Sequence, residues 1–314
     1  MKKFLILLSL SAIMMLIYTT QNVSNTKQQF YYWKQKYDVN ATQHPKYIKV
    51  LDIGQRHKLE IHKTTFSSLP SHKIVPVIYI DNPVFQKDGH IELSKKLHKL
   101  LQTMAKESFE FDEVQIDCDW SESTQKRYFN FLKNFKKLSG KIISTTIRLH
   151  QVKYYKRTGV PPVDKGVLMY YNMSDFKDLE TKNYILDLEL AKKYHHNFDT
   201  YPLPLDLALP LYAQATIIRF ASVVGFIEGV RKDDLNENFK ALEKNHYEVT
   251  KTHYFKKRLL YEGDIIRVDE VSIHDLQKAI NRLKKVMQHP EEIIFYRWGN
   301  RKDYDKQLLN SIIF

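Results

Sequence analysis

The chain has 314 residues, of which 43% are hydrophobic and 27% charged, and its formal net charge is +13. This composition is ordinary for a globular protein, and only nine glycines and ten prolines exclude long disordered tracts. The 49 Lys and Arg residues are scattered, and no nucleic-acid-binding motif accompanies them, so we expect no nucleic-acid partner.

The first 24 residues have the pattern of an export signal. Lys2 and Lys3 precede an uncharged, mostly apolar run over 4–18, which is shorter than the roughly 20 residues that a membrane span needs. No clear cleavage site follows, so residues 1–24 are equally consistent with a cleaved signal peptide and with an N-terminal membrane anchor. A buried helix of a cytosolic protein is the third reading.

Cysteine usage adds to this expectation. Cys118 is the only cysteine, which excludes an intrachain disulfide framework and a cysteine-rich metal site. An exported chain without disulfides is more typical of the bacterial envelope than of a eukaryotic secretory pathway. We therefore expect an exported protein that is periplasmic, at the cell surface, or tethered to the membrane by its N-terminal segment.

Strand-like and helix-like segments alternate along residues 25–314. Strands are predicted at 29–39, 46–54, 72–82, 111–119, 141–150, 166–173, 202–214 and 291–299, and helices at 91–104, 124–138, 273–287 and 304–313. Roughly eight strands over roughly 290 residues predict one α/β domain, a closed (β/α)8 TIM barrel. Residues 231–270 interrupt this alternation and predict an elaboration with a β-hairpin around Glu262-Gly263-Asp264.

The strand at 111–119 runs straight into carboxylates. Alternation places Gln115, Asp117 and Asp119 on one of its faces, and three polar side chains in a row are wrong for a packed core. In a parallel barrel the chemistry lies at the C-terminal ends of the strands. We therefore predict that this strand contributes Asp117 and Asp119 to an active site.

Other strands supply further polar and aromatic candidates. We predict substrate contacts from Gln115, Arg148, His150, Tyr171, Asn172, Asp206 and Trp298. Carboxylates and amides that bind hydroxyl groups, beside aromatic faces that stack on sugar rings, are typical of a glycan site. Each residue also has a structural interpretation: the two aspartates as a buried ion pair with Arg148, His150 as a core histidine, and the aromatic rings as packing.

The strand at 111–119 resembles the D-x-x-D-x-D-x-E motif of family 18 glycoside hydrolases, the chitinase-like (β/α)8 barrels. Asp112 and Asp117 match its first and third aspartates, Gln115 replaces the second, and Asp119 stands in place of the glutamate. Met169-Tyr170-Tyr171-Asn172 is similar to the family's M-x-Y-D, with Asn for Asp, and Trp298 matches a tryptophan of the last strand. The segments "IDCDW" and "YPLPLDLALP" are similar to those of a group of exported bacterial barrel proteins.

The resemblance implies glycoside hydrolysis. In the family the glutamate protonates the glycosidic oxygen, and the preceding aspartate orients the acetamido group that attacks the anomeric carbon. It implies Asp119 as the general acid and Asp117 as its partner, with Tyr171 and Asn172 positioning the sugar above Trp298. Because Asp is one methylene shorter than Glu, a compensating site, a different reaction and lost activity all remain open.

The sequence thus predicts a glycoside hydrolase-like protein that acts on an envelope or extracellular glycan. A non-catalytic glycan- or envelope-binding barrel and a structural envelope protein are the alternatives. A deep open mouth with both carboxylates exposed favours catalysis, whereas a mouth plugged by residues 231–270 favours the structural protein. His195-His196 has no third ligand at metal-ligand spacing, so we expect neither a metal nor another cofactor.

Overall fold

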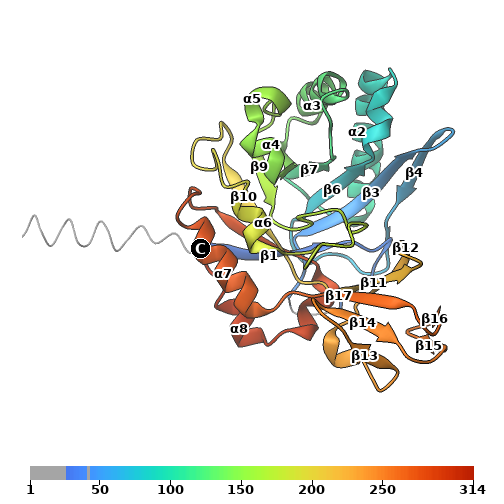
Figure 1. The fold of residues 1–314 in the computed structure, drawn as a ribbon. Helices are drawn as coiled ribbons and strands as arrows, with labels where there is room; N and C mark the ends of the chain where they lie inside the picture. The colour runs from blue at the N-terminus through green and yellow to red at the C-terminus, as the bar shows by residue number, and fades with distance from the viewer. Residues whose placement is uncertain (1–25, 41–42) are drawn as a thin grey trace, which may run out of the picture.

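The computed structural model describes residues 26–40 and 43–314. The predicted signal peptide or membrane anchor at residues 1–24 therefore lies outside the described residues. Within the described ranges, no helix combines the length and the apolar character needed to cross a bilayer. Figure 1 shows a barrel with a smaller β-rich part attached to one side.

Eight parallel strands form a closed ring, which confirms the predicted (β/α)8 barrel (Figure 1). In chain order they are β1 (Lys27–Tyr32), β3 (Tyr47–Gln55), β6 (Val75–Ile80), β7 (Glu113–Asp117), β8 (Ile142–Arg148), β9 (Lys165–Met169), β10 (Leu205–Pro210) and β18 (Glu292–Tyr296). The ring is closed by β1, which pairs in parallel with both β18 and β3.

Helices cover the outside of the barrel from its third strand onward. They are α2 (His90–Ser108), α3 (Gln125–Ser139), α4 (Leu149–Lys153), α5 (Tyr155–Thr158), α6 (Leu188–Lys192), α7 (Ile273–Leu283) and α8 (Lys306–Asn310), with 3-10 turns η1 (Asn82–Gln86), η2 (Lys232–Asp234) and η3 (Trp298–Asp303). The first two crossovers carry short strands instead: β2 (Lys36–Tyr37), β4 (Leu59–Lys63) and β5 (Thr65–Phe66). Each long helix buries one apolar stripe against the sheet, as Phe131 and Phe135 do on α3.

Strand β7 separates the hydrophobic core from a polar barrel interior. Val114 and Ile116 are fully buried in the core between sheet and helices. Gln115 faces the interior, where its amide oxygen accepts a hydrogen bond of 2.8 Å from the Tyr31 hydroxyl. Asp117, two residues further along the same face, ends the strand at the C-terminal mouth of the barrel. The predicted alternation along β7 is therefore present.

The opposite, N-terminal end of the barrel holds a network of buried charges. Lys165 lies 3.1 Å from the Glu113 carboxylate and 3.0 Å from that of Asp206. Glu292 pairs with Lys46 at 2.6 Å, and its backbone N–H donates to Asp206 at 2.8 Å. Because each buried carboxylate has a cation or a hydrogen-bond donor, the network closes this end without an unpaired charge.

Residues 214–269, between β10 and α7, form an insertion outside the ring. A five-stranded antiparallel sheet orders its strands as β12 (Ser222–Glu228), β11 (Gln214–Arg219), β17 (Ile265–Asp269), β14 (His246–Val249) and β13 (Phe239–Ala241), beside the hairpin of β15 (His253–Phe255) and β16 (Arg258–Leu260). The predicted elaboration is present, but it starts earlier than residue 231. The hairpin turn lies at Lys256-Lys257, between the paired strands β15 and β16, and not at Glu262-Gly263-Asp264 as predicted. Glu262-Gly263-Asp264 joins β16 to β17, and these two strands are not paired.

Candidate active site

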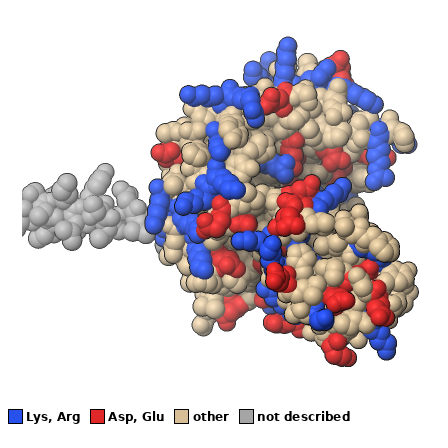
Figure 2. Space-filling view, in the orientation of Figure 1, with Lys and Arg blue, Asp and Glu red and all other residues tan. Residues whose placement is uncertain are grey.

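A pocket of about 740 Å³ opens at the C-terminal ends of the barrel strands. Figure 2 shows the hollow between the barrel and the insertion. Six of the predicted site residues line the pocket: Asp117, Asp119, Arg148, His150, Tyr171 and Asn172. The insertion forms one wall through residues between 213 and 229 and does not plug the mouth. The alternative of a structural protein predicts a plugged mouth, and the mouth is open.

Asp117 lies at the base of the pocket and is almost completely buried. The Thr146 hydroxyl donates a hydrogen bond of 2.6 Å to its Oδ1 atom. The pKa of Asp117 is raised to about 7, mainly by burial and in smaller part by the neighbouring Asp119, against the lowering effects of the Thr146 hydrogen bond and of Arg148. Asp117 therefore exchanges its proton near neutral pH.

Asp119 lies in the loop after β7 with its side chain 50% exposed. The Nε atom of Arg148, at the end of β8, is 3.4 Å from its Oδ1 atom. His150 follows on α4, and burial lowers its pKa, which favours the neutral imidazole. A second cavity, about 630 Å³, shares all three residues with the main pocket. Asp119 thus stands between two spaces, unlike the enclosed Asp117.

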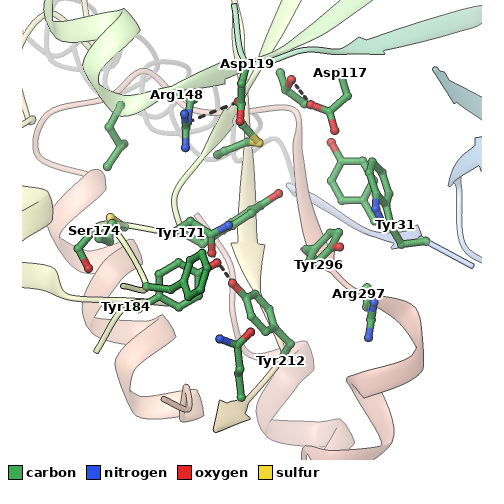
Figure 3. A pocket seen from close by; sticks show the side chains of 18 of the residues that line it. Tyr31, Asp117, Asp119, Arg148, Tyr171, Ser174, Tyr184, Tyr212, Tyr296 and Arg297 are labelled. Atoms are coloured by element: carbon green, nitrogen blue, oxygen red, sulfur yellow. Dashed lines mark hydrogen bonds and ion pairs between the residues drawn. The ribbon is translucent and has the colours of Figure 1, made fainter. Parts of the chain in front are cut away.

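Aromatic rings cover much of the pocket. Tyr171, which follows β9, stacks on Tyr296 at the end of β18 with ring centroids 5.6 Å apart and planes 20° apart. Tyr31 and Trp33 lie beside them at the end of β1. Figure 3 shows Asp117 and Asp119 on one side of the pocket, with Tyr31 beside Asp117 and with Tyr171 and Tyr296 across from the two carboxyl groups. An aromatic wall facing two carboxyl groups suits a sugar ring, whose apolar C–H faces pack on π-systems.

Asn172 reaches the pocket from a left-handed backbone position. Its φ angle is 55°, a conformation that Asn tolerates better than most residues. The Tyr212 hydroxyl, from the chain after β10, donates a hydrogen bond to the Asn172 side-chain oxygen. This contact leaves the Asn172 amide N–H groups for other partners, so the residue presents donors to the pocket.

Comparison with solved structures identifies the fold. Neither a protein-family model nor a curated protein sequence matches the chain. The spore cortex-lytic enzyme SleL of Bacillus cereus superposes with a TM-score of 0.54 at 15% identity, covering 91% of this chain and 74% of that one. A chitinase of Chromobacterium violaceum gives 0.52 at 7% identity, covering 91% and 98%. The fold is that of the chitinase-like barrels.

Two of the predicted substrate contacts do not line the pocket. Gln115 lies one pleat below Asp117, with its amide nitrogen buried and unpartnered. Asp206 is at the N-terminal end of the barrel, bonded to Lys165. The predicted substrate contact from Asp206 is not present in the pocket, because Asp206 is the second residue of β10 and therefore lies at the end of the strand opposite the mouth.

Trp298 does not form the floor of the pocket. Its ring is buried, lies edge-on to Phe30 at 5.3 Å between centroids, and is covered by the Arg301 guanidinium. The strand β18 ends at Tyr296, and Trp298 begins the 3-10 turn that follows, where its side chain packs into the hydrophobic core and not into the pocket. Tyr296 is the aromatic residue that this strand contributes to the pocket, and its place at the strand end was the available signal.

The insertion contributes residues that no sequence motif indicated. Phe226 and Glu228, on β12, line the pocket, and Glu228 pairs with Arg297 at 2.6 Å. The sequence of β12, SVVGFIE, does not alternate apolar and polar residues, so no local pattern marks them. Among the described residues, no cluster of three or more His, Cys, Asp or Glu is arranged to hold a metal ion.

A buried arginine of the insertion fixes the opposite wall. Arg267 on β17 is completely buried and pairs with Asp269 at 3.0 Å. It also donates to the backbone oxygens of Phe176 and Asp178, at 3.0 and 2.8 Å, in the loop after β9. Phe176 lines the pocket. The insertion therefore holds this loop in place through main-chain contacts, which do not depend on the loop's side chains.

Trp33 offers a direct readout of pocket occupancy. Of the three tryptophans, all of them described, it alone lines the main pocket, whereas Trp120 lines the second cavity and Trp298 is buried in the core. We expect a glycan that enters the pocket to change the intrinsic fluorescence, and Trp33→Phe to remove most of that change. An equal change in Trp33→Phe would show that the glycan binds elsewhere.

Proposed function

We propose that the chain hydrolyses glycosidic bonds of an envelope or extracellular glycan, with Asp117 and Asp119 as its catalytic carboxyl groups. One observation carries the proposal: a buried carboxyl whose pKa is about 7 lies beside an exposed one in an open aromatic-lined pocket. Environments that separate two neighbouring carboxyl groups in this way are typical of acid–base pairs in glycosidases.

Asp117 holds a proton near neutral pH, because its burial favours the neutral form and the charge of Asp119 acts in the same direction. In the proposed reaction Asp117 passes this proton to Asp119. Asp119 faces the open part of the pocket and delivers the proton to the glycosidic oxygen as the bond from that oxygen to the anomeric carbon breaks. Water then adds its hydroxyl to the anomeric carbon and returns a proton to the pair.

The remaining pocket residues bind the sugar. Tyr171 and Tyr296 support its apolar face, and Asn172 donates hydrogen bonds to its polar substituents. Arg148, beside Asp119, stabilises the carboxylate that is left after proton transfer. The similarity of the fold to SleL and to a chitinase supports a polymeric glycan as the substrate class. Export through residues 1–24, cleaved or retained as an anchor, would give the protein access to such a polymer.

A panel experiment tests the proposed function. The purified protein is incubated with chitin, N-acetylated oligosaccharides and peptidoglycan fragments, and products are identified by mass spectrometry. We expect cleavage of at least one glycan by the wild type and none by the Asp117→Asn/Asp119→Asn double variant. Binding of a glycan by both proteins without any product would make the chain a glycan-binding barrel instead.

A further inference from the structure

Lys and Arg residues that are scattered along the sequence gather on one side of the fold. Figure 2 shows them along the upper edge of the molecule, over the helices α2, α3 and α5 that Figure 1 labels there. Helices α2 to α5 together hold twelve Lys and Arg, but only two Glu and no Asp. The insertion at 214–269 is balanced instead, with ten basic and nine acidic residues. Helices α2 to α5 therefore carry most of the net charge of +13.

Six exposed lysines form two rows on neighbouring helices. We call them the lysine face, and they are Lys95, Lys99 and Lys106 on α2 and Lys126, Lys133 and Lys137 on α3. Each row has spacings of four and seven residues, which place its three lysines on the same side of the helix. At about 1.5 Å per residue each row is about 16 Å long. The helices pack on each other, with the His98 ring 6.2 Å from that of Phe135, so the two rows lie side by side.

Folding does not explain the lysine face. Only Lys95 has an ion pair with a described carboxylate, that of Glu92 at 2.8 Å. The helix dipole favours lysines in the last turns of α2 and α3, but Lys126 lies in the first turn of α3, where the dipole favours acidic residues and none is present. Lys133 and Lys137 repel each other, because like charges four residues apart destabilise a helix. The face thus keeps its positive charge at a cost to helix stability.

The residue types of the lysine face narrow the class of partner. No Phe, Tyr or Trp side chain is exposed on α2 or α3, both of which are described in full, so the face offers no ring on which a nucleic-acid base can stack. Ile91 and Leu138 are exposed, but they lie at opposite ends of the two helices and form no apolar stripe that could enter a bilayer. Lysines are point charges on flexible stems, which suits a flexible polyanion without a fixed geometry.

We propose that the lysine face binds an anionic polysaccharide, whose negative groups recur along a flexible chain. Two parallel rows of cations match such a chain in charge and in length. The proposal goes beyond the proposed function, because none of the six lysines lines the pocket or the second cavity. The face would hold the protein on the polymer while the mouth of the barrel stays open, whether or not the pocket cleaves a glycan.

The test measures binding of polygalacturonate to the purified protein by isothermal titration calorimetry, from about 20 mM to about 200 mM salt. We expect the parent protein to bind with an affinity that falls as the salt concentration rises. The triple variant Lys126→Gln/Lys133→Gln/Lys137→Gln should bind about tenfold more weakly at low salt. The slope of log Kd against log salt concentration should fall by about two, as the loss of three charge contacts predicts.

Two further variants are the controls. Replacement of the same three lysines by Arg keeps the charge and should retain binding. The triple variant Lys278→Gln/Lys284→Gln/Lys285→Gln removes three exposed lysines from α7 and the residues that follow it. It changes the net charge by the same amount, and it should leave both the affinity and the salt slope close to those of the parent protein.

Several results would overturn the lysine face as a polysaccharide site. These are no binding by the parent protein at low salt, unchanged binding in the α3 Gln variant, an equal loss in the α7 variant, or an equal loss in the Arg variant. Binding of phosphatidylglycerol vesicles or of duplex DNA that is tighter than that of polygalacturonate, and is lost in the α3 Gln variant, would assign the face to a membrane or to a nucleic acid instead. Polymer binding through the face by a protein that cleaves no glycan would support this inference and reject the proposed function.

Discussion

Replacing Asp119 by Asn is expected to lower kcat/KM on a cleaved glycan by about 100- to 10,000-fold, the usual contribution of general acid catalysis. Asn has the size of Asp but no proton to deliver at this position. The reverse expectation holds for Asp119→Glu. Because Asp119 is half exposed at an open pocket, a longer side chain has room and brings the acid nearer to the glycosidic oxygen, so activity is expected to be retained or to rise.

Asp112→Asn is the control for both Asp119 variants. Asp112 belongs to the same motif but lies exposed on the surface, paired with Lys73 at 2.7 Å, and we expect its replacement to leave kcat/KM unchanged. Steady-state kinetics on the same glycan measure all three variants. Full activity in Asp119→Asn, whatever the result for Asp119→Glu, would show that Asp119 is not the general acid.

Asp117→Asn is expected to make the protein more stable at pH 8, by about 2–4 kcal/mol. Burial raises the pKa of Asp117 to about 7 in the folded protein, against about 3.9 in the unfolded chain. Folding at pH 8 therefore requires burial of a carboxylate that water solvates better. Asn removes this charge and still offers an oxygen to the Thr146 hydroxyl, so the variant gains stability as it loses catalysis.

The pH dependence gives this prediction its sign. Between pH 4 and pH 7 the folded wild type binds more protons at Asp117 than the unfolded chain does, so its stability falls as the pH rises through this window. The advantage of Asp117→Asn should be small at pH 4 and full at pH 8, measured by urea unfolding at both values. The hydrogen bond from Lys73 lowers the pKa of the wild-type Asp112 carboxylate. Asp112→Asn should therefore show no such gain in stability. An advantage that is the same at both pH values would reject a raised pKa for Asp117.

The sequence predicted site residues correctly where the alternation along a strand and the position of the strand's end could both be read from it. Alternation along β7 separates Val114 and Ile116 from Gln115 and Asp117, because each residue of a strand faces the opposite side from its neighbours. Strand ends then place Arg148 and Tyr171 at the same mouth, as a parallel barrel requires. These rules are local, so they hold without knowledge of the rest of the chain.

Predictions failed where the result depended on the position of a strand boundary. Asp206 lies in a real barrel strand, as predicted, but at its second residue, so it contributes to the N-terminal end of the barrel and not to the mouth. Trp298 lies two residues beyond the end of β18, which is enough to turn its ring into the core. The wall formed by Phe226 and Glu228 depends on contacts between the insertion and the barrel, and no local pattern specifies those contacts.

Ring closure through β1 has a consequence for the order of folding. Lys27 pairs with Glu292, so the first strand of the barrel completes its hydrogen bonds only with the last one. Until β18 has been synthesised, β1 and β10 each expose an unpaired edge that can add strands from other chains. A chain cut short before Glu292 therefore retains most of the core residues but is expected to aggregate, and the last 23 of the 314 residues decide whether the rest stays free of aggregation during synthesis.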